Sequence, residues 1–179
     1  GTPLASVITN GTTQERDEAA TLYLEFLLRA PNRARMLHAD PHPGNFRITD
    51  DGRLAVFDFG AVNRLPHGLP ASLGRVLTEA LAGDAVALEA VLREEGFIRK
   101  GIAIDPDALL EYLKPLVEPL LHDQFTPTRE WLRGAAATLQ DPRRPQFLIG
   151  LKLNLPPEYL LIHRVWLGGI GVLSQIGGT

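Results

Sequence analysis

Three polar residues have the types and the spacing that could support chemistry. Asp40 and Asn45 lie at the two ends of a loop rich in proline and glycine, and Asp58 follows after two short apolar segments. If those segments form a β-hairpin, the chain returns and Asp58 comes close to Asn45. Two carboxylates and an amide oxygen that converge suit Mg²⁺, which prefers oxygen ligands and shares its coordination with substrate phosphates. A cation on phosphate oxygens, beside a carboxylate that orients a hydroxyl, is the minimal equipment for phosphoryl transfer.

The order of these residues matches two motifs of protein kinases. His38-Ala39-Asp40 is followed by four residues and then Asn45, which is the spacing of the kinase catalytic loop. Asp58-Phe59-Gly60 follows the expected hairpin, as the metal-binding Asp-Phe-Gly motif does in kinases. Asp40 and Asn45 alone would be read as turn residues. Both motifs in this order favour a functional site.

Residues 36–65 closely resemble the UbiB/AarF/ADCK family of atypical kinase-like proteins. The resemblance rests on His38-Ala39-Asp40-Pro41-His42-Pro43-Gly44-Asn45 and on Leu54-Ala55-Val56-Phe57-Asp58-Phe59-Gly60, and it continues more weakly through the rest of the chain. It implies a kinase-like fold that binds ATP with Mg²⁺ and acts as an ATPase or phosphotransferase. It also implies a role in coenzyme Q or other prenyl-lipid metabolism, often at a membrane surface.

The resemblance assigns a role to each matching residue. Asp40 becomes the catalytic-loop carboxylate, and Asn45 and Asp58 become the metal ligands. Apart from the resemblance, we expect His38, His42 and Gly60 to support them, with His38 bracing the loop through hydrogen bonds and His42 at the rim of the site. Phe59 is expected to pack in the core.

The sequence also departs from a complete kinase. The lysines are Lys100, Lys114 and Lys152, so none precedes Asp40, where the phosphate-binding lysine of the N-terminal lobe is expected. We therefore expect the C-terminal lobe alone, which lacks appreciable ATPase activity and has the missing N-terminal lobe as its partner. Because Ala39 replaces the usual arginine and no Ala-Pro-Glu segment follows Gly60, control by activation-loop phosphorylation is not expected.

Three other interpretations stay open. Small-molecule phosphotransferases of the aminoglycoside or choline kinase type use a similar catalytic loop. However, Phe59-Gly60 after Asp58 favours the UbiB/AarF/ADCK family over this alternative. A non-catalytic lobe that binds lipid or a partner protein belongs to a different functional class. His38, Asp40 and His42 could also form a transition-metal site, since imidazole and carboxylate suit zinc or iron.

The remaining pattern predicts the elements that position this site. Residues 1–12 have no clear periodicity and are expected to form an irregular lead-in. A helix capped by Thr12 or Thr13 begins near Gln14 and is expected to end at Pro31. A hairpin pairs residues 46–49 with 54–57, and a helical body covers residues 68–179. Asp84 and Asp105 are typical helix caps, Pro115 and Pro119 are expected to kink or split one helix, and the last helix runs from Glu158 to about Gln175. The predicted fold class is mostly α with a small β-hairpin.

Composition limits the class of protein. The chain has 179 residues, of which 45% are hydrophobic and 22% charged, as in a single soluble globular domain. A formal charge of −3 argues against a nucleic-acid partner, and the absence of cysteine excludes disulfides and thiolate metal sites. We expect a cytoplasmic protein, peripheral at a membrane, whose last helix packs in the core. Residues 4–8 are expected to be free to pack on another copy, which would make the lobe self-associate.

Overall fold

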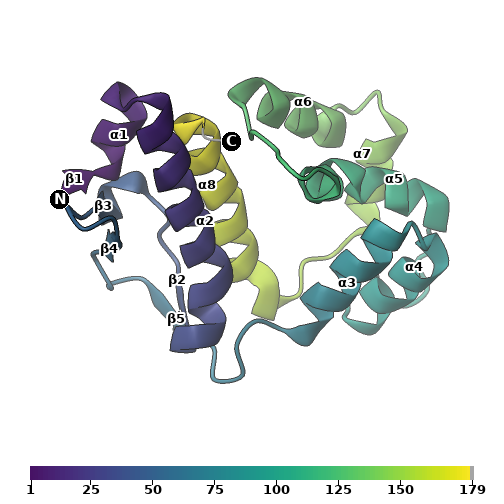
Figure 1. The fold of residues 1–179 in the computed structure, drawn as a ribbon. Coiled ribbons are helices and arrows are strands. Elements are labelled where there is room, and N and C mark those ends of the chain that lie inside the picture. Colours follow the sequence, from purple (N-terminus) through teal and green to yellow (C-terminus); the bar gives the residue numbers. More distant parts are fainter. Residues whose placement is uncertain (178–179) are drawn as a thin grey trace. The chain divides into compact units, whose positions relative to one another are not determined.

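A computed structural model describes residues 1–177 as an assembly of helices with two small antiparallel sheets (Figure 1). The chain forms two compact units. The first unit contains Gly1–Leu69, Thr126–Leu132 and Leu160–Thr179, and the second contains Pro70–Phe125 and Arg133–Tyr159. The predicted mostly helical class with a small hairpin is confirmed. The last two residues of the predicted helical body lie outside the described residues.

The predicted hairpin lies in a three-stranded sheet of the first unit. β3 (Phe46–Ile48) pairs antiparallel with β4 (Leu54–Val56), with Phe46 opposite Val56. β1 (Thr2–Pro3) adds to the other edge of β3, so the strand order is β1-β3-β4. The hairpin turn closes where Gly52 adopts a φ of +75°, a conformation that glycine reaches without steric cost.

A second sheet, which the sequence pattern did not predict, joins the two motifs. β2 (Met36–His38) pairs antiparallel with β5 (Val62–Arg64), and His38 lies opposite Val62. β2 leads into the catalytic-loop motif and β5 follows the Asp-Phe-Gly motif. Their pairing therefore joins the two ends of residues 39–61, which carry both motifs. We call these residues the loop system.

The prediction of an irregular lead-in over residues 1–12 is wrong. Residues Leu4–Asn10 form a short helix, α1, in which Leu4 is fully buried and Val7 nearly so. A helix this short is not stable by itself in water, so packing of its apolar face must hold it. Because Leu4 and Val7 are buried within their own chain, they are not free to pack on another copy.

The helix α2 (Thr13–Ala34) begins as predicted and ends later than predicted. Thr12 caps it with a complete capping box, since its hydroxyl accepts from Glu15 N while the Glu15 carboxylate accepts from Thr12 N. The helix continues through the buried Pro31 and ends where Arg35 turns to a φ of +53°. Pro31 removes one hydrogen bond from the helix, and its side chain is buried there.

The last helix, α8 (Leu160–Ile176), packs along α2 in the first unit. A Cβ atom at Gly169 would lie 2.5 Å from Leu27 Cδ1 of α2, so the two helices touch where a side chain is absent. The segment Pro157–Ile176 is long and apolar enough to cross a membrane by length and composition. This is weak evidence for a span, because core helices of soluble proteins meet the same criteria.

The second unit contains helices around an aliphatic core. Its elements are α3 (Ala71–Ala82), α4 (Ala85–Glu94), α5 (Pro106–Val117), η2 (Glu118–Leu121), most of α6 (Arg129–Gln140), α7 (Pro145–Lys152) and η3 (Pro157–Tyr159). Asp84 and Asp105 cap α4 and α5 as predicted. α5 gives way at Val117 to the tight turn η2, which confirms the split expected between Pro115 and Pro119. The core residues are Ala80, Leu88, Leu92, Ile98, Leu109, Val117 and Ile149.

Candidate functional site

The loop from Asp40 to Asn45 is held by its own polar groups. Asn45 Nδ2 donates to Asp40 Oδ2 at 2.8 Å and to the Asp40 carbonyl at 3.3 Å. His42 N donates to Asp40 Oδ1 at 3.4 Å, and Gly44 N donates to His42 Nδ1 at 3.1 Å. The hydrogen bond from Asn45 is the main cause that lowers the pKa of Asp40 below its ordinary value. Asp40 is therefore ionised at neutral pH.

Backbone hydrogen bonds tie the Asp-Phe-Gly motif to this loop. Phe57 N donates to the Asn45 carbonyl at 2.8 Å, and Ala39 N donates to the Ala61 carbonyl at 2.8 Å. Asp58 directly follows Phe57, whose backbone is hydrogen-bonded to Asn45. The hairpin therefore brings the backbone of Asp58 back toward Asn45. Asp40, Asn45 and Asp58 thus belong to one connected loop system, and their catalytic and metal-binding roles remain predictions.

Asp58 has an unusual backbone conformation. Its φ is +56°, in the left-handed region that residues with a Cβ atom rarely adopt. Its Oδ1 accepts from Gly60 N at 3.1 Å, which helps to hold the turn, and a Cβ atom at Gly60 would lie 3.1 Å from the same oxygen. Such conformations are costly and gather at functional sites, so the strain at Asp58 is consistent with a functional role.

His38 braces the site from beneath. It is 7% exposed, and its Nε2–H donates to the Phe57 carbonyl at 3.1 Å, directly before Asp58. Its ring contacts Phe46 and Phe59 with centroid distances of 5.9 and 5.6 Å. The expectation that Phe59 packs in the core is wrong, because Phe59 is 62% exposed and touches the buried histidine only by one edge.

The donor atoms fit a hard cation such as Mg²⁺. Both acceptors near Asn45 Nδ2 are oxygens of Asp40, which identifies that atom as the amide nitrogen and leaves Asn45 Oδ1 as an acceptor. Asp58 uses Oδ1 for Gly60, so its second oxygen keeps its lone pairs for a ligand. One amide oxygen and one carboxylate are a typical protein contribution to Mg²⁺, whose other ligands are water and phosphate.

The alternative transition-metal site at His38, Asp40 and His42 finds no support. His38 uses Nε2 for Phe57, and His42 uses Nδ1 for Gly44. Across residues 1–177, no group of three or more His, Cys, Asp or Glu side chains could hold a metal ion.

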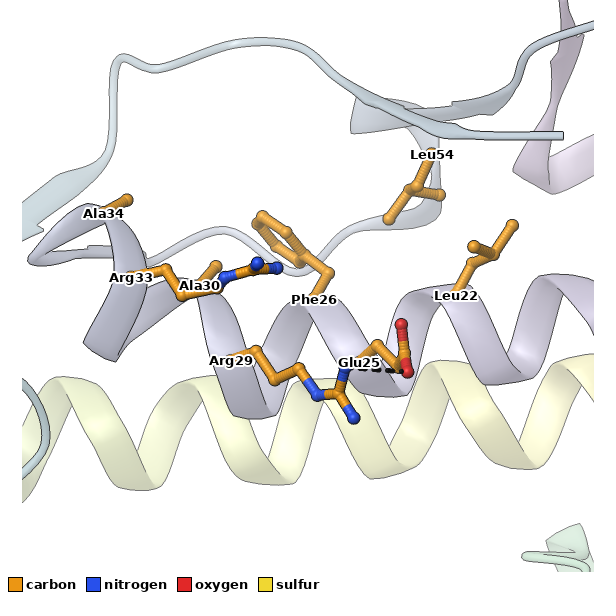
Figure 2. Close-up of a pocket in the computed structure, with 8 residues that line it drawn as sticks. All are labelled: Leu22, Glu25, Phe26, Arg29, Ala30, Arg33, Ala34 and Leu54. Carbon is orange, nitrogen blue, oxygen red and sulfur yellow. Dashed lines mark ion pairs between the residues drawn. The ribbon is translucent and has the colours of Figure 1, made fainter. Parts of the chain in front are cut away.

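A shallow groove of about 460 Å³ lies along α2 and β4. Figure 2 shows its apolar lining, to which Leu22, Phe26 and Leu54 contribute, and the ion pair of 3.2 Å between Arg29 and Glu25 on α2. None of the catalytic, metal-binding or supporting residues predicted from the sequence lines this groove. The sequence analysis also missed a hydrogen bond to the loop, from the Tyr23 hydroxyl to the Pro41 carbonyl. The spacing of apolar residues in α2 predicts that Tyr23 is buried, but it does not reveal this partner.

Comparison with known proteins identifies the family. The model of the ABC1 atypical kinase-like domain matches residues 3–92, half of the chain. The chain therefore belongs to the ABC1 atypical kinase-like family, as the motifs predicted. The match includes α1, α2, the strands β2 to β5 and the complete loop system.

Three relatives extend this result. The Arabidopsis thaliana protein ACTIVITY OF BC1 COMPLEX KINASE 3, chloroplastic, is 32% identical over 134 residues, which cover 71% of this chain and 17% of the relative. The protein slr1919 of Synechocystis sp. is 36% identical over 69 residues, which cover 38% of this chain and 12% of the relative. A structure of Rv3197 from Mycobacterium tuberculosis in complex with erythromycin matches 99% of this chain with a TM-score of 0.86 and 32% identity, and the match covers 44% of Rv3197. The chain thus spans less than half of each of these relatives.

Proposed function

We propose that this chain carries the catalytic-loop and metal-binding part of an ATP-using atypical kinase. In this proposal Asn45 Oδ1 and Asp58 hold Mg²⁺, and the rest of the whole protein holds the nucleotide against them. The bound cation supplies the positive charge that neutralises the phosphate oxygens during transfer. The hydrogen bond from Phe57 N to the Asn45 carbonyl carries the proposal, because it links the two predicted ligands through adjacent backbone.

Asp40 orients the phosphoryl acceptor in this proposal. Its lowered pKa makes it a weak base, so its main contribution is to accept a hydrogen bond from the attacking hydroxyl or water. Its Oδ2 is engaged by Asn45 and its Oδ1 accepts only a long bond from His42, which leaves capacity for a substrate hydroxyl. The same Asn45 side chain therefore connects the predicted metal ligand to the predicted catalytic carboxylate.

Metal binding tests this proposal without requiring turnover. Mn²⁺ added to the chain, followed by electron paramagnetic resonance, reports the bound fraction directly. We expect Asp58→Asn to weaken Mn²⁺ binding by roughly a hundredfold or more, because it removes the charged ligand. Asp51→Asn is the matched control, since Asp51 is an exposed residue that bonds Thr49 and Arg53 within the hairpin turn. Equal Mn²⁺ affinity in both variants would contradict the proposal.

We further propose that the whole protein acts in quinone or prenyl-lipid metabolism, peripheral to a membrane. The support is the family resemblance of residues 36–65 and the chloroplastic relative, whose name refers to the activity of a bc1 complex. The apolar segment Pro157–Ile176 is weak support for membrane association. In a strain that lacks the whole protein, we expect the wild-type gene to restore quinone content and the Asp58→Asn gene to fail. Restoration by both would refute a catalytic role in this metabolism.

A small-molecule phosphotransferase is the second candidate function. One observation favours it, namely that the structure of Rv3197 contains erythromycin. Erythromycin titrated into the whole protein with Mn²⁺ and ATP tests it, with phosphorylated macrolide detected by mass spectrometry as the supporting result. Absence of phosphorylated product with the whole protein would exclude this macrolide as the acceptor.

A further inference from the structure

A buried tyrosine supports the catalytic loop from one side. Tyr23 of α2 has no exposed surface, and its hydroxyl donates to the Pro41 carbonyl at 2.7 Å. Its ring meets Phe46 edge to face, with centroids 5.0 Å apart. Burial, and secondly the negative charge of Asp40, raise the pKa of Tyr23, so the phenol stays protonated and keeps donating.

A glycine of α8 supports the same residue by close contact. A Cβ atom at Gly168 would lie 2.5 Å from Pro41 Cγ, closer than side chains approach one another. The clashing atom belongs to a proline ring, which has no flexible end that could move aside. At Gly171, three residues later, a Cβ atom would meet nothing within 4 Å. Of these two glycines of one helix, Gly168 would place a Cβ atom against the loop and Gly171 would not.

Pro41 transmits both contacts to the predicted site because it follows Asp40 directly. The Asp40 carbonyl and carboxylate both accept from Asn45, so a shift of the backbone at Pro41 changes the geometry of both residues. We propose that Tyr23 and Gly168 are positioning residues that clamp Pro41 and thereby set the relative placement of Asp40 and Asn45. This inference rests on the proposed function for its catalytic meaning, whereas the clamp itself is a structural claim.

Four variants of the full chain test the clamp. Gly168→Ala is compared with Gly171→Ala, since both add one methyl group to α8. Tyr23→Phe is compared with Tyr159→Phe, since both remove one buried hydroxyl, and the Tyr159 hydroxyl bonds Ser72 and Glu95 in the second unit. The first readout is the pair of side-chain amide resonances of Asn45 in ¹⁵N-labelled protein, assigned by their loss in Asn45→Ser. The second readout is the Mn²⁺ affinity, and thermal unfolding shows that each variant is folded.

We expect the Asn45 amide resonances to shift in Gly168→Ala and Tyr23→Phe and to stay unchanged in Gly171→Ala and Tyr159→Phe. We expect Mn²⁺ binding to weaken by roughly tenfold in the first pair only, because a small displacement of a ligand has large effects. If Gly168→Ala does not fold, Tyr23→Phe decides the question.

Unchanged Asn45 resonances in a folded Tyr23→Phe chain overturn the clamp. Equal shifts of the Asn45 resonances in the control variants Gly171→Ala and Tyr159→Phe also overturn it, because they indicate a general loosening of the fold. If the wild-type chain binds no Mn²⁺ while the amide resonances shift as expected, the proposed metal site fails and the clamp stands.

Discussion

The two compact units of this chain are stabilised in different ways. The second unit has an aliphatic core built from α3, α4, α5 and α7, and its polar groups cap helices, pair at the surface or, at Tyr159, bond Ser72 and Glu95. The candidate site in the first unit stands instead on aromatic rings and backbone hydrogen bonds. Tyr23, Phe26, His38 and Phe46 contact one another in edge-to-face or tilted pairs beneath the loop.

Costly features also gather in the first unit. Within residues 1–177, the non-glycine residues with positive φ are Arg35 and Asp58, and both belong to it. So does the buried His38 Nδ1, which has no hydrogen-bond partner. Local violations of this kind are expected where a protein keeps groups for function, and the rest of the fold must stabilise them. The difference therefore separates a unit built around an aliphatic core from a unit that holds the candidate site in strained and unpaired conformations.

Removal of a ring beneath the loop gives the largest expected effect. Phe46 is fully buried and contacts both Tyr23 and His38. We expect Phe46→Ala to lower the free energy of unfolding by about 4 kcal/mol, measured by urea denaturation, because it leaves a cavity in the core. We also expect it to shift the Asn45 side-chain amide resonances, since the strand that carries Phe46 begins directly after Asn45.

Leu109→Ala is the matched variant in the second unit. Leu109 is also fully buried, so we expect a loss of about 3 kcal/mol. In this case the Asn45 resonances keep their positions. A shift of equal size in both variants would show that the two units do not differ in the way proposed.

Strain at Asp58 gives the next effect. Both Asp58→Ala and Asp58→Gly remove the carboxylate, and only glycine relieves the φ of +56°. We expect Asp58→Gly to be more stable than Asp58→Ala by about 1 kcal/mol in urea denaturation, and neither variant to bind Mn²⁺. Equal stability of the two variants would show that the positive φ carries no strain.

Helix caps should not distinguish the units, because a cap is a local interaction. Thr12 caps α2 in the first unit and Asp105 caps α5 in the second. We expect Thr12→Ala and Asp105→Ala each to cost about 1 kcal/mol in thermal or urea unfolding. A much larger loss for Thr12→Ala would mean that the site depends on the start of α2.

The smallest expected effect is on the ionisation of Asp40. We expect Asn45→Ala to raise the pKa of Asp40 toward its ordinary value of 3.8, measured by ¹³C NMR of the carboxyl group, because Asn45 is the main cause of its lowering. A lowered pKa stabilises the fold above the pKa of the unfolded chain, and this stabilisation is lost as the pH falls through the folded value. The variant therefore shows a weaker loss of stability in acid.

Asp141 is the internal control for this titration. Hydrogen bonds from Arg143 lower its pKa in the second unit, and we expect it to be the same in both proteins. If Asp40 titrates alike in wild type and variant, the hydrogen bond from Asn45 does not control it.

The sequence alone determined the features that depend on neighbours a few residues apart. Thr12 with Glu15, and Asp105 with Ala108, specify helix starts through bonds within one turn. The hairpin follows from two short apolar runs around a glycine turn, and the family was indicated by the resemblance of residues 38–45 and 54–60 to its motifs. These patterns are visible in the chain because the interacting groups are also close in sequence.

The tertiary structure decided whatever depends on a distant partner. Residues Leu4–Asn10 form a helix and α2 continues through Pro31 because other elements bury them, and propensity alone predicted the opposite. β2 forms by pairing with β5. Pro41 is contacted by both Tyr23 and Gly168, which lie on two helices far apart in the chain. The sequence thus determined which residues could do chemistry, whereas only packing between distant segments determined how they are held, because that geometry is a property of the assembled first unit.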